Sequence, residues 1–231
     1  MQRLPRLLSV AFILCCAGIF AVAASAQQQQ QATPSAGQVA VEEWLDNFDG
    51  AQLDADKWEP FSFEGAGGGK SKIEGGQLRL RGLGGSRFGV RSKQSFKGER
   101  FIVEATIARV GAALPELNQK GLAIGNAVVN IMFDSSGRNR IEWLLTSEGT
   151  FEAWSVVDGQ GARLDDRKLA TKIKNPTLGI VRLGDEFLFM LNGQEGLRKT
   201  IKNMPRGFRV MLYGFGSSEN NWDSVRVVTK K

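Results

Sequence analysis

Short runs of alternating apolar and polar residues cover most of the chain from about residue 77 to its end. Alternation with a period of two is typical of β-strands that are buried on one face and exposed on the other. The pattern predicts ten strands, at 77–81, 88–92, 101–110, 128–134, 140–146, 150–157, 178–183, 186–191, 208–213 and 223–228. No segment of helical length carries an apolar stripe at 3.6-residue spacing, so the sequence predicts an all-β domain.

Turn residues separate these runs and indicate antiparallel connections. The segments 134–139 and 147–149 join three successive predicted strands as a meander. The segment 183–186 and the Asn192-Gly193 pair are typical of tight hairpin turns, in which glycine supplies the positive φ. No repeat of solenoid period is visible. The pattern therefore predicts one antiparallel β-sandwich.

The first 26 residues have the pattern of a secretory signal peptide. Arg3 and Arg6 precede an apolar segment at 7–23, and the small residues at 24–26 form a cleavage site. A membrane anchor is the alternative, but an apolar run of about 17 residues is at the short end of the transmembrane range. We therefore expect a signal peptide at 1–26 and a secreted or periplasmic bacterial protein, without a stable membrane span once the signal is removed.

A polar, low-complexity segment follows the predicted signal peptide. Its run of glutamines continues into alanine, threonine, proline, serine and glycine, a composition that cannot bury a core. We expect a disordered Gln-rich leader at 27–38 and the folded β-sandwich domain at 39–231. The glycine-rich segment 65–71 is expected to be a flexible loop and not a phosphate-binding loop, because Glu64 stands where the first glycine is required.

The residue types that are missing exclude several kinds of chemistry. The chain contains no histidine, and both of its cysteines lie in the predicted signal peptide. The processed chain would therefore have no disulfide, no Cys/His zinc site and no Ser-His-Asp or Cys-His catalytic group. The net charge of +6 is spread along the chain, and no clustered basic stripe predicts a nucleic-acid partner.

The two ends of the predicted domain carry characteristic runs of residues. The opening run is WLDNFDG at 44–50, followed by Lys57-Trp58, and the closing run is WDSVRVV at 222–228. Together these runs resemble the opening and closing strands of the concanavalin A-like lectin/glucanase superfamily. Between them, the segments 121–125 and 178–193 look like inner strands of laminin-G-like and glucanase-like sandwiches. The resemblance implies an antiparallel jelly-roll β-sandwich and a carbohydrate ligand.

The chain departs from the hydrolases of that superfamily at their catalytic strand. Laminarinase- and lichenase-type enzymes carry Glu-x-Asp-x-(x)-Glu there, which places nucleophile and acid on one face of the sheet for retaining hydrolysis. No glutamate of this chain is followed two residues later by aspartate. We therefore predict a secreted, non-catalytic carbohydrate-binding module that recognises a polysaccharide or glycan in a groove of one sheet.

Two alternatives stay open. One is a glycoside hydrolase, or an enzyme like the keto-disaccharide hydrolases, that uses a divergent carboxylate pair formed by Glu142 and Glu152. The other is a structural or adhesive envelope protein. If the protein is a binding module or an envelope protein and not an enzyme, the two glutamates are expected to face solvent on a half-exposed sheet.

Alternation places the candidate ligand-binding residues on the more polar faces of their strands. Sugar rings stack on tryptophan and tyrosine, while their hydroxyls bond to arginine and carboxylates. We predict a groove lined by Trp154, Tyr213, Glu142, Glu152 and Arg209. Partial burial in the core is the alternative for the two aromatic residues.

Other residues in the strands are expected to be structural or to lie at the surface. Trp143 alternates with two apolar residues and is assigned to the core, and Glu104 is expected to pair with an arginine. Arg91 and Arg182 fall in the middle of strands, where a charged residue is expected to face solvent or a ligand.

The resemblance also implies a structural calcium ion near the chain ends. Asp223 matches the closing-strand ligand of related sandwiches, and Asp49 or Asp46 would contribute from the opening run. Calcium takes six to eight oxygen ligands, so backbone carbonyls would have to complete the set. The alternative is that Asp49 belongs to an Asp-Gly turn and Asp223 bonds to the local backbone.

Overall fold

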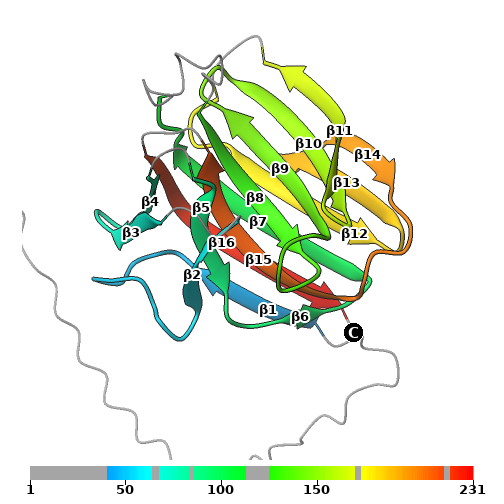
Figure 1. Cartoon of the computed structure of the whole chain (residues 1–231), viewed down its shortest axis with the longest axis horizontal. Helices are drawn as coiled ribbons and strands as arrows, with labels where there is room; N and C mark the ends of the chain where they lie inside the picture. Colours follow the sequence, from blue (N-terminus) through cyan, green and yellow to red (C-terminus); the bar gives the residue numbers. More distant parts are fainter. Residues whose placement is uncertain are drawn as a thin grey trace, which may run out of the picture. The chain divides into compact units, whose positions relative to one another are not determined.

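The computed structural model describes residues 41–63, 68–83, 86–112, 125–169, 173–215 and 219–230. These residues form two stacked antiparallel sheets and no helix, which confirms the expected all-β sandwich (Figure 1). No helix in these ranges is long and apolar enough to cross a membrane. The predicted signal peptide and leader, residues 65–67 of the expected loop and residues 121–124 lie outside the described residues.

The first sheet, which we call the β16 sheet, is built around two long central strands. In order across the sheet it contains β14 (Gln194–Thr200), β13 (Glu186–Leu191), β12 (Thr177–Leu183), β7 (Arg100–Arg109), β16 (Asn220–Lys230), β4 (Leu78–Gly82) and β3 (Gly69–Ile73). A further strand, β1 (Val41–Asp46), pairs with β16, with Trp44 opposite Val227. The opening and closing runs of the domain are therefore neighbours in one sheet.

The second sheet, which we call the β8 sheet, contains the expected meander. In order it consists of β11 (Gln160–Lys168), β10 (Thr150–Val157), β9 (Arg140–Thr146), β8 (Asn126–Met132), β15 (Gly207–Phe215), β5 (Phe88–Ser92) and β2 (Trp58–Ser62). A short strand, β6 (Phe96–Lys97), pairs with the start of β15. The meander fixes the register in which Glu142 of β9 lies opposite Asn130 of β8 and Trp154 of β10.

The hydrophobic core lies between the two sheets and takes one face of each strand. Trp58 and Trp222 are almost completely buried in it. Trp143 is also buried there, as expected, and its Nε1 donates a hydrogen bond to the backbone carbonyl of Met190 at 2.9 Å. This bond joins a strand of the β8 sheet to a strand of the β16 sheet. It satisfies the indole N–H inside the core.

All ten predicted strands are present, and the described residues contain six strands more: β1, β2, β3, β6, β11 and β14. Because β3 begins at Gly69, the expected loop at 65–71 is wrong for its last three residues. A Cβ atom at Gly69 would lie 2.1 Å from two ring atoms of Phe88. Glycine is needed there because the ring packs directly on the backbone, and not because the chain is flexible.

Arg182 is buried, so the expected surface position is wrong. Its side chain has only 2% of its surface exposed, and its guanidinium donates hydrogen bonds to the backbone carbonyls of Gly184, Met204 and Pro205. Burial lowers the pKa of this guanidinium below its ordinary value. Arg182 therefore ties β12 to the segment before β15 and is not available to a ligand.

Candidate functional site

The β8 sheet has a second face, turned away from the β16 sheet, which we call the outer face. The strand register lines up side chains in rows across it. The central row runs through Glu59, Arg91, Met211, Asn130, Glu142 and Trp154. A second row runs through Phe61, Gly89, Tyr213, Val128, Leu144 and Glu152, and a third through Arg209, Met132, Arg140 and Val156. All five predicted ligand-binding residues lie on this face.

Aromatic residues cover the centre of the outer face. Phe63, directly after β2, packs edge-to-face on Tyr213 with ring centroids 5.3 Å apart. Phe61 packs on Phe63 at 5.2 Å, and the guanidinium carbon of Arg140 lies 4.6 Å from the Phe63 ring centroid. As a result Tyr213 is 3% and Glu142 6% exposed. The expectation that Glu142 faces solvent is wrong, and Tyr213 follows the alternative of burial.

Two donors hold the buried carboxylate of Glu142. Arg140 Nε donates to its Oε1 at 2.5 Å, and the Tyr213 hydroxyl donates to the same oxygen at 2.8 Å. Arg140 also donates to the backbone carbonyl of Gly137 at 2.7 Å. Burial, followed by the negative charge of Glu142, raises the pKa of Tyr213 well above its ordinary value. The phenol therefore stays protonated at neutral pH, as a donor must.

Trp154 and Glu152 lie at the less covered end of the outer face, beside the edge strand β11, and both are half-buried. Trp154 Nε1 donates a hydrogen bond to Glu152 Oε2 at 2.8 Å, which fixes the orientation of the indole. Glu152 lies opposite Leu144, two pairs along from the Glu142–Trp154 pair. The two carboxylates therefore share a face on adjacent strands, and each accepts a hydrogen bond from a protein donor.

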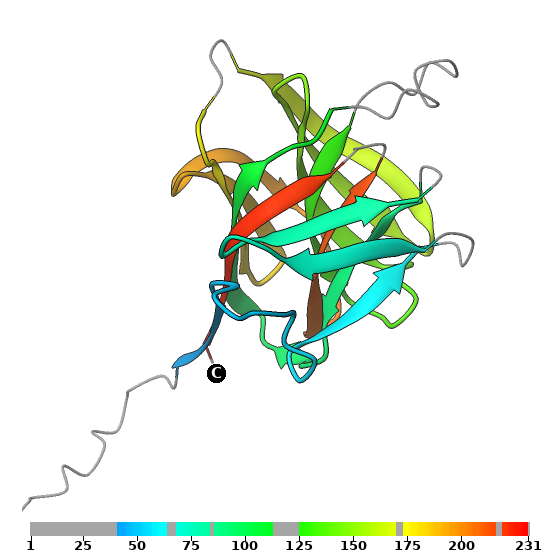
Figure 2. The ribbon, with the colours of Figure 1, turned by 90° about the vertical axis from the view of Figure 1, so that its left-hand side faces the viewer.

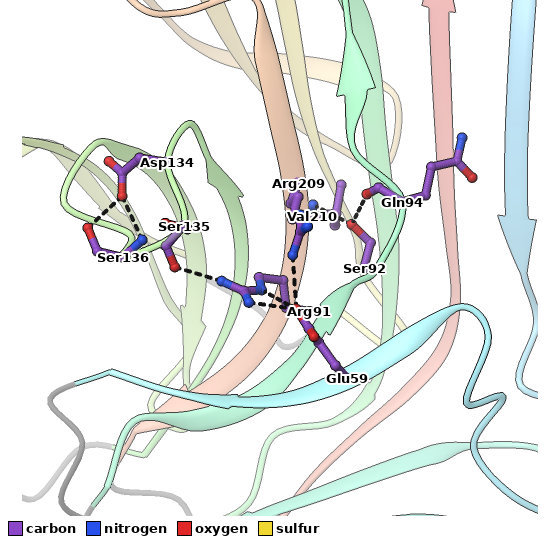
Figure 3. A network of polar contacts seen from close by, with 9 residues as sticks. All are labelled: Glu59, Arg91, Ser92, Gln94, Asp134, Ser135, Ser136, Arg209 and Val210. Carbon is purple, nitrogen blue, oxygen red and sulfur yellow. Dashed lines mark hydrogen bonds and ion pairs between the residues drawn. The ribbon is translucent and has the colours of Figure 1, made fainter.

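Arg209 lies at the opposite end of the outer face in a network with Glu59 and Arg91 (Figure 3). Glu59 Oε1 accepts hydrogen bonds from Arg209 Nη1 at 2.9 Å and from Arg91 Nη2 at 2.6 Å. The hydrogen bond from Arg91 is the largest cause that lowers the pKa of Glu59, and it outweighs the effect of partial burial. Three strand spacings of about 4.8 Å separate β15 from β10, so Arg209 and Trp154 are roughly 14 Å apart across the sheet.

Asn130 lies on this face and is not among the five predicted ligand-binding residues. It is fully buried on the central strand β8, and neither its Oδ1 nor its Nδ2 has a hydrogen-bond partner within the described ranges. An unpaired buried amide group costs about 1–3 kcal/mol. The sequence does mark this residue, because Asn130 is the polar residue that interrupts an otherwise apolar run at 127–133.

The residues proposed for calcium already have hydrogen-bond partners in the protein or are exposed. Asp223 lies at a bulge of β16 and its Oδ1 accepts a hydrogen bond from Gln77 Nε2 at 2.8 Å. Both carboxylate oxygens of Asp46 accept hydrogen bonds from protein donors, and Asp49 is exposed. The described part of the chain holds no group of three acidic residues placed to bind a metal. A calcium ion at Asp223 and Asp49 would depend largely on backbone carbonyls, and this site stays a prediction.

Calcium binding is tested by thermal unfolding. An ion that binds only the folded protein stabilises it by about 2.7 kcal/mol at a hundredfold excess over Kd. Calcium should therefore raise the melting temperature of the wild-type protein and leave that of Asp223→Asn unchanged. Equal melting temperatures of the wild type in calcium and in chelator would rule out the site.

The fold is similar to those of solved glycan-degrading enzymes. An endo-β-1,3-glucanase from Pyrococcus furiosus matches 81% of this chain and 94% of its own, with a TM-score of 0.62 and 14% identity. The β-glucanase of Bacillus licheniformis matches 82% of this chain and 98% of its own, with a TM-score of 0.57 and 12% identity. Porphyranase B from Zobellia galactanivorans matches 87% and 97%, with a TM-score of 0.58 and 12% identity.

These similarities establish the fold and leave the activity open. No protein-family model matches the chain, and no curated protein sequence matches it. At these low identities, shared architecture carries no statement about chemistry. The domain has the jelly-roll β-sandwich fold of these glucanases, which is the fold that the opening and closing runs implied.

Proposed function

We propose that this protein binds carbohydrate on the outer face of the β8 sheet and does not cleave it. The observation that carries the proposal is Trp154, which is half-buried at the less covered end of that face and held in one orientation by Glu152. A fixed indole gives a sugar ring a flat surface for stacking at a low entropic cost. Polar groups beside it, including the Glu152 carboxylate, can bond to the hydroxyls.

The arrangement of the carboxylates supports binding without cleavage. Retaining hydrolysis needs a free carboxylate nucleophile and a second carboxyl group that donates a proton. Glu142 is instead buried and bonded to Arg140 and Tyr213, and Glu152 is bonded to Trp154. The central strand β8 contributes Val128, Asn130 and Met132 to the outer face and no carboxylate.

The similar structures support a glycan as the class of ligand. Their names describe enzymes that act on β-1,3-glucan, on β-glucan and on porphyran. The signal peptide predicted at 1–26 supports an extracellular or periplasmic location, so the ligand would be a glycan outside the cytoplasm. Which polysaccharide binds is the question for the experiment.

A glycan array probed with the domain at 39–231 tests the proposal, followed by titration of the best neutral ligand. Trp154→Ala should weaken binding about tenfold or more, because it removes the stacking surface. Trp154→Phe keeps a ring and should retain part of the affinity. Leu183→Ala, which truncates an exposed residue of the β16 sheet, is the matched control and should bind as the wild type does.

Two outcomes would contradict this proposal. If glycan binding is unchanged in Trp154→Ala, the outer face is not the site. If no glycan on the array binds, the structural or adhesive envelope role becomes the better explanation.

The enzymatic alternative has its own assay. Release of reducing ends from laminarin and lichenan, and of products from keto-disaccharides, is measured for the wild type, Glu142→Gln and Glu152→Gln. We expect no release above the background of a buffer control. Activity in the wild type that either substitution abolishes would show a hydrolase with a divergent acid pair.

A further inference from the structure

Four basic residues gather on the β3–β4 hairpin, at one edge of the β16 sheet. Lys70 lies opposite Arg81, and we call these the first couple; Lys72 lies opposite Arg79, and we call these the second couple. On β4 the arginines alternate with two buried leucines, so the basic side chains point away from the core. Like charges directly opposite each other destabilise an antiparallel pair. The hairpin therefore carries an electrostatic cost.

Acidic residues neutralise only one of the two couples. In the second couple, Lys72 Nζ and Arg79 Nη1 each lie 2.7 Å from Glu74 Oε2. Arg79 Nη1 also lies 3.7 Å from Glu219 Oε1. Arg79 Nε is buried and has no hydrogen-bond partner in the ranges that the structure describes. For the first couple, those ranges provide no ion pair at all, and both of its side chains are exposed.

Protection of a sheet edge explains half of these charges. Lysines on an edge strand discourage pairing with the edge of another molecule, and β3 is an edge strand. This reason accounts for Lys70 and Lys72. It does not account for Arg79 and Arg81, because β4 lies between β3 and β16 and has a neighbour on each side.

The four cations border a groove on the flank of the sandwich. It lies where the edge strand β3 of one sheet and the edge strand β2 of the other face the same side, toward the viewer in Figure 2. Its lining adds Pro60 of β2, Phe88 of β5, Gly69 and Ser71 of β3 and one acidic residue, Glu219, to the basic residues, and its volume is about 520 Å³. This volume is in the range of ligand-binding clefts, roughly 300–1,000 Å³.

We infer that this flank groove is a second binding site, separate from the outer face, for an anionic saccharide that carries sulfate or carboxylate groups. The inference rests on the proposed function in one respect, namely that the ligand is a glycan. Along each strand the two cations are two residues apart, or about 7 Å, and the strands are about 5 Å apart. Charges at this spacing suit anionic groups that repeat along a polymer, because a single small anion would contact only one couple.

The surroundings of the groove favour a saccharide over a nucleic acid or a membrane. Single-stranded nucleic acid is held by bases that stack on exposed aromatic rings. Phe88, the aromatic residue of the groove, is only 6% exposed and offers no such platform. A flat lipid surface would make no use of the groove, and anionic vesicles test that alternative directly.

Dextran sulfate and neutral dextran provide a matched pair of probes, since they differ only in the anionic groups. The wild type should bind dextran sulfate and not dextran at about 0.15 M salt, with affinity falling as salt is added. Lys70→Gln/Arg81→Gln should bind dextran sulfate at least about tenfold more weakly. Its melting temperature without ligand should be equal to or higher than that of the wild type, because the repulsion between the first couple is relieved.

The control variant is Lys168→Gln/Lys202→Gln, which removes the same charge from exposed positions away from the groove. It should keep its affinity for dextran sulfate within about twofold. An equal loss in both double variants would overturn the inference, because net charge alone would explain binding. Binding of single-stranded DNA or anionic vesicles with the same dependence on Lys70 and Arg81 would also overturn it.

Trp154→Ala separates this inference from the proposed function. It should lose binding to the neutral glycan and keep binding to dextran sulfate. If no neutral glycan binds but dextran sulfate binding depends on the first couple, the proposed site on the outer face fails and the flank groove stands. If dextran sulfate binding is indifferent to the first couple while neutral glycan binding depends on Trp154, the opposite holds.

Discussion

Replacing Arg140 with methionine should lower the free energy of unfolding by about 3–5 kcal/mol, because it leaves the carboxylate of Glu142 buried without its cation. Both side chains are buried on the outer face, and Arg140 Nε lies 2.5 Å from Glu142 Oε1. The hydrogen bond from the Tyr213 hydroxyl remains in the variant but carries no compensating charge. Urea unfolding at neutral pH measures the effect as a shift of the midpoint.

Arg91→Met is the matched control, because it removes the same kind of side chain from a more exposed pair on the same face. Glu59 is partly exposed and would keep its bond to Arg209 at 2.9 Å, so the loss should be smaller than in Arg140→Met, although Arg91 also donates to the backbone carbonyl of Ser135. Adding Glu142→Leu to Arg140→Met should recover part of the stability, since the unpaired charge is then absent. Equal losses in Arg140→Met and Arg91→Met would show that the buried pair has no special role.

Arg182→Ala should cost about 3 kcal/mol or more, because three backbone carbonyls lose a charged donor inside the protein. The guanidinium bonds to Gly184 beyond the end of β12 and to Met204 and Pro205 before β15. Arg182→Lys should recover little of this stability, since an ammonium group cannot reproduce the planar fork of donors. The measurement is again the midpoint of urea unfolding.

Arg198→Ala serves as the control for this second experiment. Arg198 bonds to Glu195 and Glu186 at the surface, where solvent screens the pairs. Its loss should leave the unfolding midpoint unchanged within error. A variant Arg182→Lys as stable as the wild type would mean that charge alone, and not the geometry of the fork, holds the segment before β15.

Alternation predicts the strands that have two neighbours and misses those that have one. The four strands at the ends of the two sheets are β14 and β3, and β11 and β2, and none of them was predicted. β11 shows the reason, because most of its positions are exposed and no buried face imposes an apolar residue at every second place. An edge strand can be held by backbone pairing with a single neighbour, which leaves little trace in the sequence.

The candidate site shows the same limit. Alternation correctly places Glu142, Glu152 and Trp154 on one face, because the period of a strand determines which way a side chain points. It could not give the depth of burial of Glu142 and Tyr213. The rings that cover the centre of the face belong to β2 and the residue after it, an edge strand that the pattern does not reveal.

The pairing of β1 with β16 also determines how the domain responds to a pulling force. Val41, the first residue of β1, lies opposite Lys230, the last residue of β16, so the two ends leave the sandwich side by side (Figure 1). Hydrogen bonds between antiparallel strands run perpendicular to the strands. Tension between these ends would therefore break the hydrogen-bonded pairs between β1 and β16 one after another, starting at Val41 and Lys230. We therefore expect the domain to have a low resistance to tension at its ends, whatever the stability of its core.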